Sequence, residues 1–151
     1  MRGQVPTSAL PHVPGFDDTF ALLAIGTVHS TLRELGEAPR QGDEGAPDAW
    51  IDVDPTWADG LRRLETGNEL IVITWLHQAD RAVLEVHPRN DRTNPLTGVF
   101  GTRSPDRPNP LGLHRVTVRE ISGTRLLVGP IEAIDGTPVV DIKVALGTGD
   151  R

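Results

Sequence analysis

The residues best suited to chemistry lie between Gly98 and Leu113, in the run G-V-F-G-T-R-S-P-D-R-P-N-P-L-G-L. Its three prolines each remove a backbone donor, which excludes a helix interior or a paired central strand. Its two arginines present fixed forks of N–H donors, and such forks suit anionic or planar ligands. We therefore predict a rigid, cationic binding loop, because binding residues are concentrated on such loops.

Three other polar clusters stand beside expected strands or loops. They are Pro39-Arg40-Gln41, His77-Gln78 and Asp135-Gly136-Thr137. Taken singly, each has an ordinary structural explanation: an exposed loop, the polar end of a buried strand, and a turn in which Asp and Gly tolerate unusual backbone angles. Asp141 and Lys143, the only lysine of the chain, share one face of an alternating strand, where a simple ion pair is one interpretation and a role in the site is the other.

Composition excludes several classes of site. The chain has 151 residues, a net charge of -6 and no cysteine, so disulfides, thiolate metal sites and a cysteine nucleophile are excluded. The five histidines show no metal-ligand spacing, and no metal site is predicted. The acidic balance argues against a general nucleic-acid binder. From Arg81 to Arg115, however, six arginines stand against three acids, which allows a local basic face.

The elements that must position these clusters are mostly strands. We predict a mainly β fold, a small antiparallel β-barrel with one short helix and long functional loops. A helix is expected at Pro55–Leu64, a hairpin turn at Ser122-Gly123 and a long loop at Thr31–Ala49. Apolar or alternating runs predict strands at Phe20–His29, Trp50–Val53, Glu69–Leu76, Arg81–Val86, Val116–Ile121, Arg125–Val128 and Val139–Val144.

The organisation of the chain is simple. Residues 1–19 mix Pro, Gly, Ser and Thr without periodicity, which predicts a flexible N-terminal arm before a single domain over residues 20–151. No apolar run reaches the roughly 18 to 20 residues that span a bilayer, and Met1–Gly15 lacks the apolar stretch of a signal peptide. A soluble, cytoplasmic enzyme or binding module is the expectation.

Taken together, the clusters resemble one family. T-R-S-P-x-R-P-N-P-x-G-L at 102–113, D-G-T-P-V-V-D-I-K at 135–143, P-R-Q at 39–41 and H-Q at 77–78 closely resemble the TrmO family, also called TsaA-like or YaeB. The resemblance runs from about residue 25 to residue 146. It implies an S-adenosylmethionine-dependent methyltransferase on a small antiparallel β-barrel, acting as a homodimer with the cofactor near the subunit interface. The activity it implies is N6-methylation of threonylcarbamoyladenosine at position 37 of tRNA, beside the anticodon.

The resemblance also implies which residues hold the cofactor. Arg40 or Arg103 would take its carboxylate in a bidentate pair, and Leu113 and Ile134 would sandwich its adenine. Asp135 is the candidate base for the acceptor proton, with His77 second. The full set implied for cofactor binding is Pro39, Arg40, Gln41, His77, Gln78, Arg103, Leu113, Ile134, Asp135, Gly136 and Thr137.

Some residues depart from the family pattern and leave the methyl acceptor open. Asp106 replaces an aromatic or histidine, His114 replaces a serine, and Val144-Ala145 replaces Pro-Tyr. A carboxylate at position 106 would repel a phosphate backbone. An enzyme that methylates a small metabolite is therefore the alternative to a tRNA methyltransferase, and a protein that senses the cofactor without turnover is a third interpretation.

Overall fold

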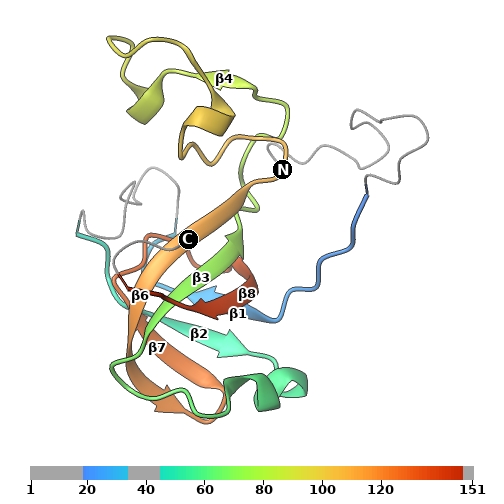
Figure 1. Ribbon diagram of the computed structural model, residues 1–151, viewed down its shortest axis with the longest axis vertical. Coiled ribbons are helices and arrows are strands. Elements are labelled where there is room, and N and C mark those ends of the chain that lie inside the picture. The colour runs from blue at the N-terminus through green and yellow to red at the C-terminus, as the bar shows by residue number, and fades with distance from the viewer. Residues whose placement is uncertain (1–18, 34–44, 148–151) are drawn as a thin grey trace. The chain divides into compact units, whose positions relative to one another are not determined.

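The computed structural model describes residues 19–33 and 45–147, and six of its strands form a closed antiparallel barrel (Figure 1). The barrel order is β1-β2-β7-β6-β3-β8, and every neighbouring pair is antiparallel. This confirms the predicted small antiparallel β-barrel. The strands are β1 (Gly26–His29), β2 (Ala49–Val53), β3 (Glu69–Trp75), β6 (Leu111–Ser122), β7 (Arg125–Gly129) and β8 (Pro138–Val144).

Alternation along the strands decides which side chains face the barrel interior. In β3, Leu70, Val72 and Thr74 are buried while the residues between them are partly exposed. Most inward positions carry β-branched or other aliphatic side chains, and burying one such side chain contributes about 1.5–3 kcal/mol. The core consists of Val28, Ala49, Ile51, Val53, Leu70, Val72, Val116, Val118, Leu126, Val128, Ile131, Ala133 and Val139.

A second compact unit contains His77–Pro110, the segment that connects the end of β3 to the start of β6. It contains the short strands β4 (Glu85–Val86) and β5 (Thr97–Gly98), which pair with each other, and the 3-10 turns η4 (Pro88–Asn90) and η5 (Val99–Gly101). Most of the predicted cationic loop lies in this unit. The prediction of a single domain over residues 20–151 stays a prediction.

Arginines hold the loop of the second unit together from within. The Arg107 guanidinium donates to the backbone oxygens of Val99, Thr102 and Ser104 at 2.7, 2.7 and 2.8 Å. Arg81 Nε donates to the Pro108 oxygen at 2.6 Å. Because prolines supply no donor, side chains take over the bonding that a strand ladder provides elsewhere.

Two boundaries at the start of the chain differ from the sequence prediction. The first strand begins at Gly26 and not at Phe20, and the side chains of Phe20 and Leu23 are largely exposed. Gly26 crosses β2 so closely that a Cβ there would lie 2.6 Å from the Asp52 oxygen. Among the described residues, the ladder with β2 begins only at this contact. Residues 1–18, most of the predicted arm, and residues 34–44 of the predicted long loop lie outside the described ranges.

The predicted helix at Pro55–Leu64 is a 3-10 helix, η3, over Pro55–Leu61. The Asp54 carboxylate caps it by accepting the Thr56 N–H at 2.8 Å, and this bond lowers the pKa of Asp54. The helix ends three residues early because the backbone of Arg62 leaves the helical region, with a ψ of 130°, and Arg63 has a φ of 73°. Within the described ranges, no helix is long and apolar enough to cross a membrane.

Two strand predictions in the middle of the chain were wrong at their ends. β6 begins at Leu111, inside the segment predicted as a loop, because Pro110 is the last proline of that segment and Leu111 pairs with Trp75. Of Arg81–Val86, only Glu85–Val86 is a strand, since Ala82 N–H bonds the Asp80 carboxylate in a turn. The hairpin at Ser122-Gly123 and the remaining strands are confirmed to within two residues.

Candidate functional site

The turn before β8, Ile134 to Thr137, carries four of the residues implied in cofactor binding. Backbone bonds hold it against the end of β1: Gly136 N–H donates to the Val28 oxygen at 2.8 Å, and Val28 N–H donates to the Thr137 oxygen at 2.9 Å. Gly136 has a φ of 85°, a region that favours glycine. The turn therefore continues the barrel's backbone bonding beyond the strand and has a fixed position.

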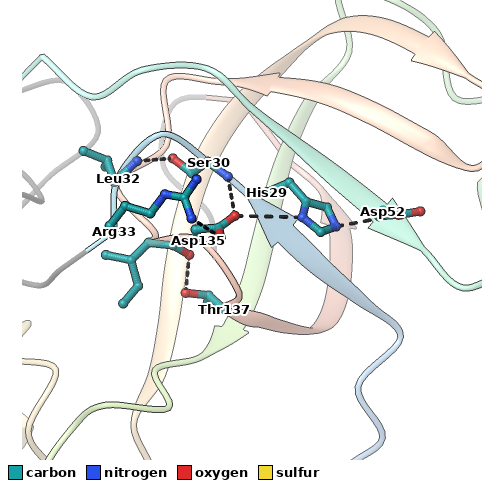
Figure 2. A network of polar contacts seen from close by, with 8 residues as sticks. His29, Ser30, Leu32, Arg33, Asp52, Asp135 and Thr137 are labelled. Atoms are coloured by element: carbon teal, nitrogen blue, oxygen red, sulfur yellow. Dashed lines mark hydrogen bonds and ion pairs between the residues drawn. The ribbon is translucent and has the colours of Figure 1, made fainter.

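The Asp135 carboxylate lies at the centre of a polar network on this turn (Figure 2). Its Oδ1 accepts the Ser30 N–H at 3.0 Å, and its Oδ2 lies 3.4 Å from an Arg33 guanidinium nitrogen. The Asp135 N–H donates in turn to the Leu32 oxygen at 2.6 Å. These contacts hold the carboxylate in one orientation, with part of its surface open to solvent.

His29 extends this network and was missed in the sequence analysis. Its half-exposed ring lies between two carboxylates, with Nδ1 3.8 Å from Asp135 Oδ1 and Nε2 3.7 Å from Asp52 Oδ2 (Figure 2). A signal existed, because His29 is the last residue of an expected strand and the polar residues Ser30 and Arg33 follow it closely. The partner Asp52 depends on strand register, which the sequence does not show.

Burial limits what the other turn residues present to a ligand. The Ile134 side chain is 4% exposed, whereas that of Leu113 on β6 is 50% exposed. Thr137 is buried, and its hydroxyl donates to the Ile134 oxygen at 2.7 Å. Leu113 thus offers an apolar surface, while Ile134 and Thr137 mainly shape the backbone of the turn.

The second unit carries His77, Gln78 and Arg103. His77 comes two residues after β3, and burial lowers the pKa of its imidazole, which favours the neutral form. Arg103 is exposed, in contrast to Arg107, which bonds three backbone oxygens. Asp106 accepts the Asp80 N–H at 2.8 Å, so part of its hydrogen-bonding capacity is used inside the unit.

The predicted site residues are thus divided between parts of the chain. The barrel carries Leu113 and Ile134–Thr137, and the second unit carries His77, Gln78 and Arg103. Pro39, Arg40 and Gln41 lie outside the described residues. In residues 19–33 and 45–147, no group of three or more His, Asp or Glu side chains is arranged to hold a metal ion. The Asp141–Lys143 ion pair is confirmed, with 3.3 Å between Nζ and Oδ2.

Comparison with known proteins relates this geometry to one family. The model of the tRNA-methyltransferase O N-terminal domain matches residues 27–151. A probable S-adenosyl-L-methionine-binding protein of Archaeoglobus fulgidus is 42% identical over 130 residues, which are 85% of this chain and 35% of that protein. A second protein of that organism, an S-adenosyl-L-methionine-binding protein, is 41% identical over 122 residues, 81% of this chain and 86% of its own length.

A solved structure agrees in fold. The crystal structure of TrmO from P. aeruginosa superposes with a TM-score of 0.67 at 29% identity, over 85% of this chain and 55% of that one. This chain therefore spans about half the length of that TrmO and about a third of the first relative.

Proposed function

The chain belongs to the tRNA-methyltransferase O N-terminal domain family, and from this membership we propose that it binds S-adenosyl-L-methionine and transfers its methyl group. The names of the two Archaeoglobus relatives support the cofactor. The match over residues 27–151, together with the fixed turn around Asp135, is the observation that carries the proposal.

The residues of this chain fit the chemistry of that cofactor. S-adenosylmethionine offers a carboxylate, an ammonium, a ribose diol and an adenine, and it supplies an electrophilic methyl carbon when bound. The exposed Arg103 suits the carboxylate, and the half-exposed Leu113 suits one face of the adenine. Asp135, with part of its carboxylate open to solvent, suits the ammonium or the ribose hydroxyls.

Hydrogen bonding at the turn refines how adenine would be recognised. The N–H groups of Asp135, Gly136 and Thr137 all donate to backbone oxygens within the protein. The Ile134 and Thr137 oxygens also accept hydrogen bonds within the protein, so a ligand bound there would meet the other carbonyls of the turn, and the donor on the adenine edge is its amino group. We propose that carbonyl oxygens of the turn accept hydrogen bonds from the adenine amino group. This contact would also discriminate adenine from ligands that carry only acceptors at that position.

We propose that the methyl acceptor is N6 of threonylcarbamoyladenosine at position 37 of tRNA. The family's description names tRNA, and the excess of arginines between Arg81 and Arg115 suits a phosphate backbone. Methyl transfer to nitrogen is a displacement in which most of the rate comes from positioning. Asp135, oriented by Ser30 and Arg33, is the proposed acceptor of the proton that leaves the nitrogen.

Mass spectrometry of tRNA tests this proposal. Purified protein with S-adenosylmethionine should add one methyl group to threonylcarbamoyladenosine in tRNA from a strain that lacks the protein. Asp135→Asn keeps an oxygen for the Ser30 N–H but removes the proton acceptor, so at saturating cofactor turnover should fall about 100-fold or more, beyond any loss of cofactor affinity. Equal rates for both proteins at every pH would show that positioning alone suffices.

A small-metabolite acceptor is the second candidate, and Asp106 is the observation that favours it. Its carboxylate is partly exposed in the otherwise cationic loop, where it would repel an RNA backbone. The two candidates differ in salt dependence, because tRNA binding releases counterions and weakens steeply as salt rises. Turnover that is insensitive to salt, with no methyl group added to tRNA, would favour the small metabolite.

Homodimerisation is also proposed, and sedimentation of the purified chain tests it.

A further inference from the structure

Three polar side chains from distant parts of the sequence form a hydrogen-bonded chain, two of them buried and the third, Glu132, 17% exposed. Thr74 on β3 and His114 on β6 are 0% and 4% exposed, and Thr74 Oγ1 lies 2.6 Å from His114 Nε2. His114 Nδ1 lies 2.6 Å from Oε1 of Glu132, in the segment between β7 and β8. The inward positions before and after them on these strands are mostly aliphatic.

The Glu132 carboxylate accepts a hydrogen bond from the His114 Nδ1–H, because a carboxylate oxygen is an acceptor. At the other ring nitrogen, the Thr74 hydroxyl can donate or accept, so it pairs with His114 Nε2 in either tautomeric role. Among the described residues, no buried side-chain nitrogen or oxygen lacks a partner. The array is therefore fully satisfied, as a buried polar network must be to avoid a large cost.

Gly112 leaves the space that the array needs. A Cβ at position 112 would lie 2.5 Å from Thr74 Oγ1 and 2.8 Å from His114 Nε2. Gly112 is paired with Thr74 across β3 and β6, directly before Leu113. The β6 backbone therefore lies close to the contact between the Thr74 hydroxyl and the His114 imidazole. The next residue, Leu113, points its side chain to the opposite face of the strand.

Glu132 lies in the segment that leads into the turn of the candidate site. Its neighbours Ile131 and Ala133 are both part of the barrel core, and Ile134 and Asp135 follow at once. Backbone bonds hold the turn on one side, from Gly136 to Val28 of β1 and from Asp135 to Leu32 beyond that strand. The hydrogen bond between Glu132 and His114 links the same segment to β6, the strand that carries Leu113.

We propose that Thr74, His114 and Glu132 are positioning residues that set the spacing between Leu113 and the turn at Ile134–Thr137. This inference rests on the proposed function, because those two groups are assigned to the adenosine part of S-adenosylmethionine. An aliphatic trio would fill the same volume, but it would lack the direction and the defined length of hydrogen bonds between the two segments. Loss of the array should therefore affect cofactor affinity beyond any loss of stability.

Two pairs of variants test the array through its chemistry. Glu132→Ala removes the acceptor for His114, whereas Glu132→Gln keeps an oxygen for the Nδ1–H. Thr74→Val removes the hydroxyl with little change of shape, whereas Thr74→Ser keeps it. Val118→Ala is the matched control, because Val118 is buried on β6 in the core and does not belong to the array. It should lower stability without touching the positioning bonds.

Two measurements then decide the outcome. By calorimetry, Glu132→Ala should raise the dissociation constant of S-adenosylmethionine about tenfold, Glu132→Gln should stay within about twofold of wild type, and Val118→Ala should leave it unchanged. In the cofactor-free protein, amide exchange at Asp135, Gly136 and Thr137 should be faster in Glu132→Ala than in Val118→Ala. Thr74→Val should likewise weaken cofactor binding and speed amide exchange at the turn, whereas Thr74→Ser should stay close to wild type in both measurements.

Each result has one meaning for the inference. Equal affinity and equal exchange in Glu132→Ala and Val118→Ala would overturn it and leave the array a packing feature. Failure of the wild type to bind S-adenosylmethionine would overturn the proposed function. In that case the exchange data still decide whether the array holds the turn, because that measurement needs no cofactor.

Discussion

In the barrel, buried aliphatic side chains and strand ladders hold the chain together, whereas in the His77–Pro110 unit side chains bond directly to backbone atoms. The barrel core comprises thirteen buried residues from its strands and from the segment before β8. In the second unit, Val99 and Ala79 are among the few buried apolar residues. The barrel therefore owes its order to area removed from water, and the second unit owes its order to particular hydrogen bonds.

This difference matters for the residues implied in cofactor binding, because both regions carry some of them. The turn at Ile134–Thr137 is held by backbone bonds of the barrel. Arg103 lies in a loop whose shape depends on Arg107. A substitution in the barrel should lower global stability, while one in the second unit should change local order or ligand affinity.

The largest effect is expected in the barrel core. Leu126 is fully buried, so Leu126→Ala should lower the free energy of unfolding by about 2–5 kcal/mol through lost burial and the remaining cavity. Denaturant unfolding followed by circular dichroism measures it. Leu84→Ala in the second unit is the control, and because Leu84 is mostly exposed, the change should stay within about 0.5 kcal/mol. Similar losses of unfolding free energy in Leu126→Ala and Leu84→Ala would contradict the proposed difference between the barrel and the second unit.

Arg107→Ala tests whether the second unit depends on its arginine. Losing the bonds to Val99, Thr102 and Ser104 should lower the local opening free energy of that loop by about 1.5–3 kcal/mol, as measured by amide exchange. Arg107→Lys should not restore it, since an ammonium lacks the planar fork. An equal loss of protection in the barrel strands would show that the two regions are not independent.

Arg103→Ala is the comparison for Arg107→Ala, because Arg103 is exposed whereas the Arg107 guanidinium is hydrogen-bonded to backbone oxygens. If Arg103 binds the cofactor carboxylate, the substitution should weaken S-adenosylmethionine binding by about 1.5–3 kcal/mol. The melting temperature should hardly change. Calorimetry and thermal unfolding of the same sample measure both, and wild-type affinity would remove Arg103 from the site.

The smallest effect concerns His77, whose pKa is lowered by burial from the ordinary value of 6.5. The unfolded chain therefore binds a proton at His77 more readily than the folded protein does. Stability should fall as the pH drops through 6.5 towards the lower pKa of the folded state, and above 6.5 His77 should have no such effect. Exchange in the second unit of wild type and His77→Gln, compared across this range, measures the difference. Parallel pH dependence in both proteins would assign the loss to other groups.

Local patterns predicted much of the fold. Glu69–Trp75 and Arg125–Gly129 alternate or are continuously apolar, and a short turn with Gly123 at positive φ joins β6 to β7. Such signals depend on neighbouring residues, so they are present in the sequence itself. The start of β1 was predicted six residues early because Phe20 and Leu23 are apolar yet lie exposed, outside the ladder. Apolar character alone does not show whether a partner strand exists.

The sequence by itself determined the residue clusters and the family, because proline, arginine and glycine spacing along one segment needs no knowledge of distant contacts. Only the tertiary structure decided what those residues touch. Asp135 meets Ser30 across 105 positions, and Thr74 meets His114 across 40. Strand register brings such pairs together, and a slip of one residue would turn each side chain to the opposite face.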